Sequence, residues 1–217
     1  MTKFGSSFVD VVQIIAVFAP VIGIALGFDA VVKERKSNSL NVLLTHPVFR
    51  DNIITGKFLG AIVTLALVVF LTITVITGTS LIITGKMANF LEFGRLFIFG
   101  FLTFFYLLVF LAIGIFTSVL SKSEIDSLTY GIVAWLNLCV VFGAIIVLIA
   151  TVVTGQSLFD MGENAQFTEL TFKLHKFSPM HHYAEATIGS SDLSFGGFAK
   201  HETIHGVLDT HYTLTEW

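Results

Sequence analysis

Hydrophobic and charged residues are segregated along this chain in long blocks. Four runs contain no Asp, Glu, Lys, Arg or His, and they cover residues 11–28, 58–85, 96–121 and 127–159. A helix of about 20 residues crosses the hydrocarbon core of a bilayer, so each run can hold one membrane-spanning helix. The pattern predicts spans near residues 8–28, 58–84, 96–120 and 130–153.

The runs are continuously apolar, as in IVTLALVVFLTITVITG, whereas strands of a membrane barrel alternate over about ten residues. A soluble core helix of this length and hydrophobicity is disfavoured. A cleavable signal peptide is rejected for the first run, because Asp10 precedes it and Asp29 follows it, where such a peptide has a basic start. We therefore expect an all-α membrane protein with four transmembrane helices.

Composition supports this class. Hydrophobic residues make up 54% of the chain and charged residues only 12%, and there are 23 phenylalanines, which excludes an ordinary soluble domain. The net charge is −3 and no dense basic patch occurs outside one loop, so nucleic acid is not an expected partner. Cys139 is the only cysteine, which excludes an intrachain disulfide and a cysteine-based metal cage.

The connections between the runs differ in charge. Basic residues gather in the first connection and recur in the short third one: Lys33, Arg35, Lys36, Arg50, Lys57 and Lys122. By the positive-inside rule, the loop formed by residues 29–57 lies in the cytoplasm and residues 155–217 lie outside it. We expect a transmembrane domain over residues 1–154 and an extracytoplasmic loop region over residues 155–217.

The loop region is polar and holds six of the seven histidines. Its Phe-rich beginning, residues 157–183, is expected to pack a short helix along the membrane surface. Pro179 is expected to end that helix. His181 and His182 are neighbours in sequence and would not face each other on a helix, so a ligand pair made of these two would need a loop.

The cytoplasmic loop is long for a helix connection. Ser37, Asn38 and Ser39 are candidate caps for a short amphipathic helix. Its apolar residues at helical spacing and the residue that ends it are Leu40, Leu43, Leu44 and Pro47. A soluble partner could bind such a helix, while the alternative is a solvated loop that only sets topology.

This stretch resembles the ABC type-2 permease family, which has a cytoplasmic glutamate, a small-residue and leucine segment, then proline, arginine and a glycine-lysine pair. The matching residues are Glu34, Ser39, Leu40, Leu43, Leu44, Pro47, Arg50, Gly56 and Lys57. The family commonly has Gly-Thr-Leu where this chain reads Asn38-Ser39-Leu40. The later spans and the SPMHHY stretch are similar too, but the family usually has six spans, so the chain looks like a fragment lacking the first and the last.

The resemblance implies the permease of an ATP-driven exporter in the plasma membrane, with an unidentified substrate. A cytoplasmic ABC ATPase subunit would bind the loop through Glu34, Arg35 and the segment from Ser39 to Lys57. A second permease copy, identical or not, would complete the path. ATP and magnesium belong to the ATPase, since the pairs Gly56-Lys57 and Gly85-Lys86 lack the other residues of a phosphate-binding loop. We expect no enzymatic activity and no cofactor in this chain.

Gly23 and Gly27 have the small-xxx-small spacing that allows two membrane helices to approach closely. Such a pair serves either a dimer contact or ordinary packing between neighbouring helices of one chain. The sequence leaves both roles open.

HETIH, residues 201–205, supplies a competing signal. On a helix, His201 and His205 would bind zinc with Glu202 as general base, and His211 could be a third ligand. Leu208 stands where the longer metalloprotease pattern has glycine, and the segment lacks an apolar face. We therefore assign no metal site. A membrane-anchored zinc protease and a non-transporting scaffold remain the alternative functions.

Overall fold

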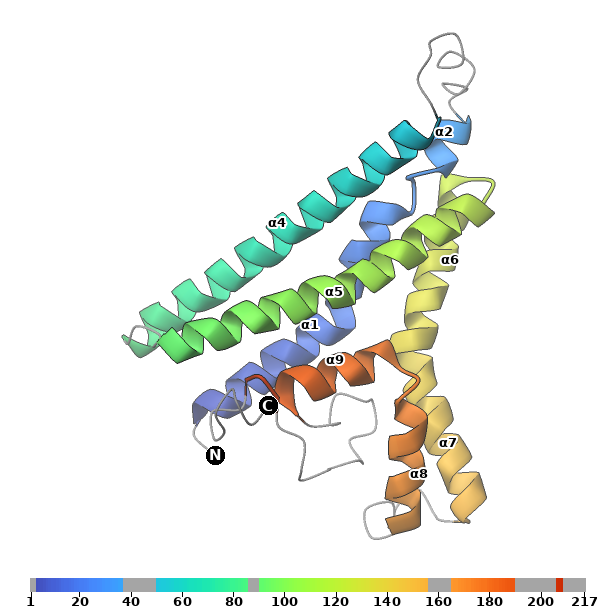
Figure 1. Cartoon of the computed structure of the whole chain (residues 1–217). Coiled ribbons are helices and arrows are strands. Elements are labelled where there is room, and N and C mark those ends of the chain that lie inside the picture. The colour runs from blue at the N-terminus through green and yellow to red at the C-terminus, as the bar shows by residue number, and fades with distance from the viewer. Residues whose placement is uncertain (1–2, 37–49, 86–89, 156–164, 190–205, 209–217) are drawn as a thin grey trace. The chain divides into compact units, whose positions relative to one another are not determined.

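A computed structural model describes residues 3–36, 50–85, 90–155, 165–189 and 206–208, and among these residues it has helices and turns but no strand (Figure 1). Its helices are α1 (Lys3–Gly27), α2 (Val32–Lys36), α4 (Arg50–Thr84), α5 (Phe90–Leu120), α6 (Glu124–Leu136), η1 (Asn137–Val141), α7 (Phe142–Thr154), α8 (Ala165–His175) and α9 (Pro179–Ile188). The expected all-α class is confirmed.

Within the described part of the chain, four stretches are long and apolar enough to cross a bilayer: Val12–Lys36, Thr55–Thr79, Phe90–Leu120 and Glu124–Thr154. Each overlaps one of the four predicted spans, which confirms their number. The chain is a multi-pass membrane protein. Whether it divides functionally at residue 154 stays a prediction.

Helix α4 shows how polar side chains are accommodated in such a span. Only 11% of its apolar window is buried within the protein, so most of its surface is available to lipid. Thr64, Thr72, Thr74 and Thr77 each donate their hydroxyl hydrogen to the carbonyl oxygen four residues earlier, at 2.7–2.8 Å. A donor in lipid needs a partner within its own helix, and these threonines have one.

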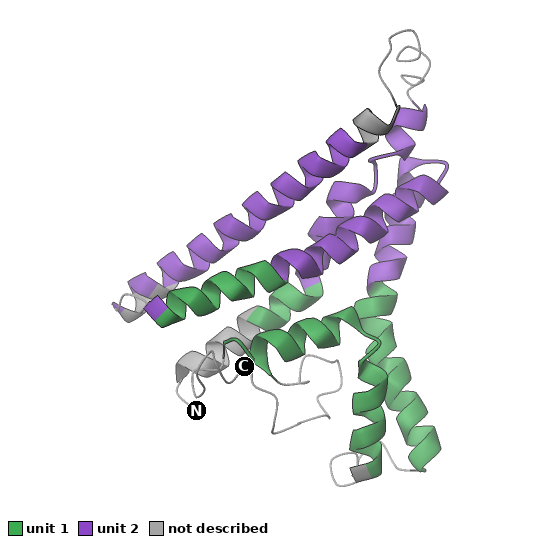
Figure 2. Cartoon of the chain, in the orientation of Figure 1, with its two compact units in different colours: residues 1–17, 91–102, 136–217 green, residues 18–90, 103–135 purple. Residues whose placement is uncertain are grey.

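The chain contains two compact units, shown in separate colours in Figure 2. One consists of residues 1–17, 91–102 and 136–217, and we call it the first unit. The other, the second unit, consists of residues 18–90 and 103–135.

In the second unit, glycines bring the backbones of α1 and α5 into direct contact. A Cβ atom added to Gly23 would lie 2.7 Å from the carbonyl oxygen of Leu107, and one added to Gly27 would lie 2.8 Å from the amide nitrogen of Ile115. From the other side, a Cβ on Gly114 would lie 2.8 Å from the carbonyl oxygen of Ile24. Both glycines of the small-xxx-small pair therefore pack against a helix of their own chain.

In the first unit, the last span contains a π-helical turn, η1, before it continues as α7 and ends at Gly155, whose φ of +68° favours glycine. Helix α8 packs beside α7, with Phe167 and Ala150 fully buried between them (Figure 1). Two further residues, Val207 and Leu208, donate backbone hydrogen bonds to the carboxyl end of α9.

The expectation that Pro179 ends a helix was wrong. Helix α8 already stops at His175, and Pro179 is the first residue of α9. Proline suits this position because the first amide of a helix needs no intrahelical acceptor and the ring fixes a helical φ angle. Ser178 caps the new helix, its hydroxyl oxygen accepting from the amide of His181 at 3.4 Å.

The glycine contact gives a test with a matched control. Gly23→Ala should destabilise the protein by about 1–3 kcal/mol, because the added methyl group overlaps the backbone of α5. Gly60→Ala, on α4, has open space around the new Cβ and should stabilise by roughly 0.5–1 kcal/mol through helix propensity. Thermal unfolding in detergent measures both. Equal effects of the two changes would contradict close packing at Gly23.

Candidate functional site

The turn that follows α1 is held by a serine of α5. Ser118 is fully buried, and its hydroxyl oxygen accepts hydrogen bonds from the backbone amides of Val31 and Val32, both at 3.0 Å. These amides open α2, a helix of five residues that cannot satisfy its own first donors. Ser118 thus serves α2 as an N-terminal cap supplied by another helix.

Helix α2 in turn caps α5. The Arg35 guanidinium donates to the carbonyl oxygens of Val119 at 3.1 Å and Ser121 at 3.3 Å, which lie where α5 ends. The last carbonyl groups of a helix lack intrahelical donors, and a cation there also complements the helix dipole. Each of the two helices therefore satisfies backbone groups that the other leaves open.

A salt bridge joins the same short helix to α4. The Lys57 ammonium lies 2.7 Å from a carboxylate oxygen of Glu34, and it also donates to the carbonyl oxygen of Ala30 at 3.4 Å. The side chains of Glu34 and Lys57 are 26% and 36% exposed, so the pair is shielded more than a free surface pair. Opposite charges at this distance attract more strongly when water is partly excluded.

A fourth contact fixes the turn to α6. Ser127 is fully buried and donates its hydroxyl hydrogen to the carbonyl oxygen of Phe28 at 2.6 Å. Its oxygen lies 3.4 Å from the hydroxyl of Thr117, which bonds back to the carbonyl of Gly114 at 2.9 Å. Residues 28–36 are thereby tied to α4, α5 and α6 within the second unit.

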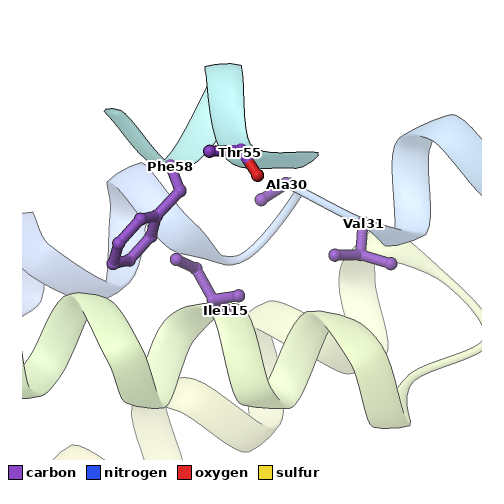
Figure 3. A pocket seen from close by; sticks show the side chains of 5 residues that line it. All are labelled: Ala30, Val31, Thr55, Phe58 and Ile115. Carbon is purple, nitrogen blue, oxygen red and sulfur yellow. The ribbon is translucent and has the colours of Figure 1, made fainter. Parts of the chain in front are cut away.

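An apolar cavity of about 170 Å³ lies beside this turn. Its lining comes from the turn, from α4 and from α5: Ala30, Val31, Thr55, Phe58 and Ile115. Figure 3 shows the side chains of Phe58 and Ile115 extending toward one another across the space. The cavity thus adjoins the turn whose polar contacts are described above, and it is open at one side, since Phe58 is partly exposed.

Some of the predicted site residues are brought together. Glu34 and Lys57 form an ion pair, and Arg35 binds the end of α5. Arg50 is the first residue of α4, but its side chain is outside the described residues. Also outside them are Ser39, Leu40, Leu43, Leu44, Pro47, His201, Glu202, His205 and His211, so the amphipathic helix and the zinc alternative stay predictions.

Sequence reasoning missed the buried hydroxyl groups. Ser118, Ser121 and Ser127 all lie in or near the short connection after the third apolar run, where polar residues read as an ordinary turn. The available signal was the spacing of Thr117 and Ser121 on one helix face at the end of that run. Their partners are backbone groups far away in sequence, which no local pattern identifies.

Four candidate membrane-spanning helices, together with the polar contacts that join residues 28–36 to α4, α5 and α6, define the chain as a helical membrane protein. The sequence model of one protein family, the ABC-2 family transporter proteins, matches residues 3–204 of this chain. The chain belongs to this family.

One curated relative gives a second comparison. The chain is 33% identical over 70 residues to a protein of Stutzerimonas stutzeri described as a probable ABC transporter permease protein, NosY. The match covers 32% of this chain and 25% of that relative. The chain thus matches about a quarter of the relative's length.

Removing the Ser118 hydroxyl tests the clamp, by which we mean the hydrogen bonds from the amides of Val31 and Val32 to Ser118. Ser118→Ala leaves one buried and one partly buried amide without their acceptor and should lower the free energy of unfolding by about 1–3 kcal/mol. Cleavage by trypsin after Lys33, Arg35 or Lys36 should also become faster. The control is Thr129→Ala, because that exposed hydroxyl bonds only within its own helix. Unchanged stability and cleavage in Ser118→Ala would show that the clamp does not hold α2.

Proposed function

We propose that this chain is part of the permease of an ATP-driven ABC exporter and that α2 transmits the movement of a cytoplasmic ATPase subunit to the spans. The observation that carries this proposal is the attachment of one short helix to two long ones. Arg35 binds the end of α5, while Glu34 binds Lys57 near the start of α4. A force applied to α2 would therefore act on both spans.

The contacts suit transmission because most of them end on backbone atoms. A side chain that binds another side chain can rotate away, whereas the carbonyl oxygens of Val119 and Ser121 move only with α5 itself. When two ATPase subunits close on ATP, a displacement of α2 would shift the spans between inward-open and outward-open arrangements. The cavity near Phe58 leaves space for that shift.

Sidedness and partners follow from the same proposal. The protein lies in the plasma membrane. By the positive-inside rule, its basic loop is on the cytoplasmic side and residues 155–217 are on the extracytoplasmic side. ATP and magnesium are bound by the ATPase subunit, and a second permease copy encloses the path. The chain itself carries out no covalent chemistry, and its substrate is not specified by the residues described.

The first test is a pull-down of the complete gene product from its native membranes. An ATP-binding subunit should co-purify with wild type, and the complex should hydrolyse ATP. Recovery of the protein without any ATP-binding partner would overturn the proposal.

A charge exchange tests the linkage inside the chain. Glu34→Lys or Lys57→Glu alone should leave the complex assembled but reduce nucleotide-dependent movement of α4, measured by spin-label distances, at least tenfold. The double exchange should restore much of it, since the attraction is re-formed with reversed charges. If the double exchange restores nothing, Glu34 acts directly on the ATPase and not through Lys57.

The chain supplies a matched control for this exchange. Glu169 and Lys173 in α8 form an ion pair at 2.6 Å, but both side chains are 66% exposed. Reversing these charges should change neither assembly nor movement. Exposed ion pairs contribute only about 0–1 kcal/mol to stability. This pair also lies within α8 and does not link that helix to α4 or α5. A comparable loss of movement in the control would show that the assay reports general destabilisation.

A further inference from the structure

A second, smaller cavity lies in the first unit, where α8 turns into α9 beside η1. Its volume is about 10 Å³, which is about the space of one small atom or one water. The residues that line it are Leu138, Cys139, Phe142, Gly143, His175, Ser178, Met180 and His181. Residues that carry two imidazoles, a thioether and a thiol thus line a space that admits a single guest.

The hydrogen bonding of His175 fixes its tautomer. Its Nδ1 atom lies 2.8 Å from the carbonyl oxygen of Thr171, and a carbonyl can only accept, so Nδ1 carries the hydrogen. The other nitrogen, Nε2, is then a bare lone pair, and it is buried without a hydrogen-bond partner. Histidines that bind metals usually have this arrangement, with one nitrogen bonded to a carbonyl and the other free for the ion.

His181 is even less satisfied. His181 is only 4% exposed, and neither nitrogen of its ring has a hydrogen-bond partner. The nearest carboxylate oxygen, on Glu185, lies 3.9 Å from Nε2, which is too long for a hydrogen bond. Burial, followed by the positive charges of His175, His182 and Lys176, lowers the pKa of His181 to about 4, and burial also lowers the pKa of His175. Imidazole binds a metal through a ring nitrogen that carries no hydrogen, and His175 has one at Nε2 because its hydrogen lies on Nδ1.

Unsatisfied buried nitrogens are rare in native proteins and call for a guest or a functional reason. The ring centroids of His175 and His181 are 5.5 Å apart, so one small ion between the rings can approach a nitrogen of each. The π turn η1 brings Cys139 to the same cavity, and such turns occur frequently at functional sites.

The donor set points to the kind of ion. Among the described residues, no three His, Cys, Asp or Glu side chains are placed to hold a metal ion together, which disfavours zinc because zinc takes four ligands of these types. A soft d¹⁰ monovalent cation accepts fewer ligands and prefers sulfur and imidazole. Met180, 4% exposed and lining the cavity, adds the soft thioether. We propose that His175, His181 and Met180 bind one Cu(I) ion at the corner between α8 and α9.

The test uses the full chain purified in detergent, reduced and free of oxygen. Titration with Cu(I) against a chromogenic Cu(I) chelator should give one tightly held ion per chain, and X-ray absorption should show nitrogen and sulfur neighbours. His175→Gln and His181→Gln should abolish that stoichiometric ion. His182→Gln is the matched control, since His182 is the exposed neighbour of His181 on the same helix and bonds only the carbonyl of Lys176.

Two further variants keep the result interpretable. Met180→Leu preserves the volume of the side chain, so the fold should persist while Cu(I) affinity falls at least tenfold and the sulfur signal weakens. A variant with His201, His205 and His211 changed to Gln should bind Cu(I) like wild type. The proposal is overturned if wild type binds no Cu(I), if the tail variant loses the ion, or if His175→Gln and His181→Gln retain it, in which case the cavity holds water only. None of these measurements depends on an ATPase partner.

Discussion

The constraint that governs this protein is that a backbone polar group within lipid or buried in the protein must find its partner inside the protein. Helix interiors meet it automatically, but helix ends do not. The contact between α2 and α5 resolves two ends at once, because Ser118 accepts from the start of α2 and Arg35 donates to the end of α5. A change to Ser118 would leave amides at the start of α2 without their acceptor, and a change to Arg35 would leave carbonyl groups at the end of α5 without their donor.

That reciprocal contact depends on the glycines above it. Gly27 and Gly114 allow the backbones of α1 and α5 to touch, and this sets the end of α1 beside the end of α5. Only at such a short distance can a serine hydroxyl reach amides of the following turn. The glycines in the spans thus determine which polar groups can meet at the ends of these helices. Hydrogen bonding at the helix ends therefore depends on helix packing within the membrane.

Much of the fold was predictable and part of the site was not. The four spans follow from uninterrupted apolar runs, a signal that lipid makes strong because charge is so costly there. Glu34 and Lys57 were selected by family resemblance as separate motif residues, but only the structure shows that they form a pair. Pro179 was misassigned because proline both ends and begins helices, and the sequence does not say which. The pairing of His175 with His181 depends on how α8 and α9 meet, which no local pattern encodes.

The ion pair between Glu34 and Lys57 also has a consequence for the chain that connects them. It holds two residues that are far apart in sequence, one in α2 and one in α4, in direct contact. Joining two points of an unfolded chain costs entropy that grows only with the logarithm of their separation in sequence, so folding must offset this cost before the attraction between the two charges stabilises the protein.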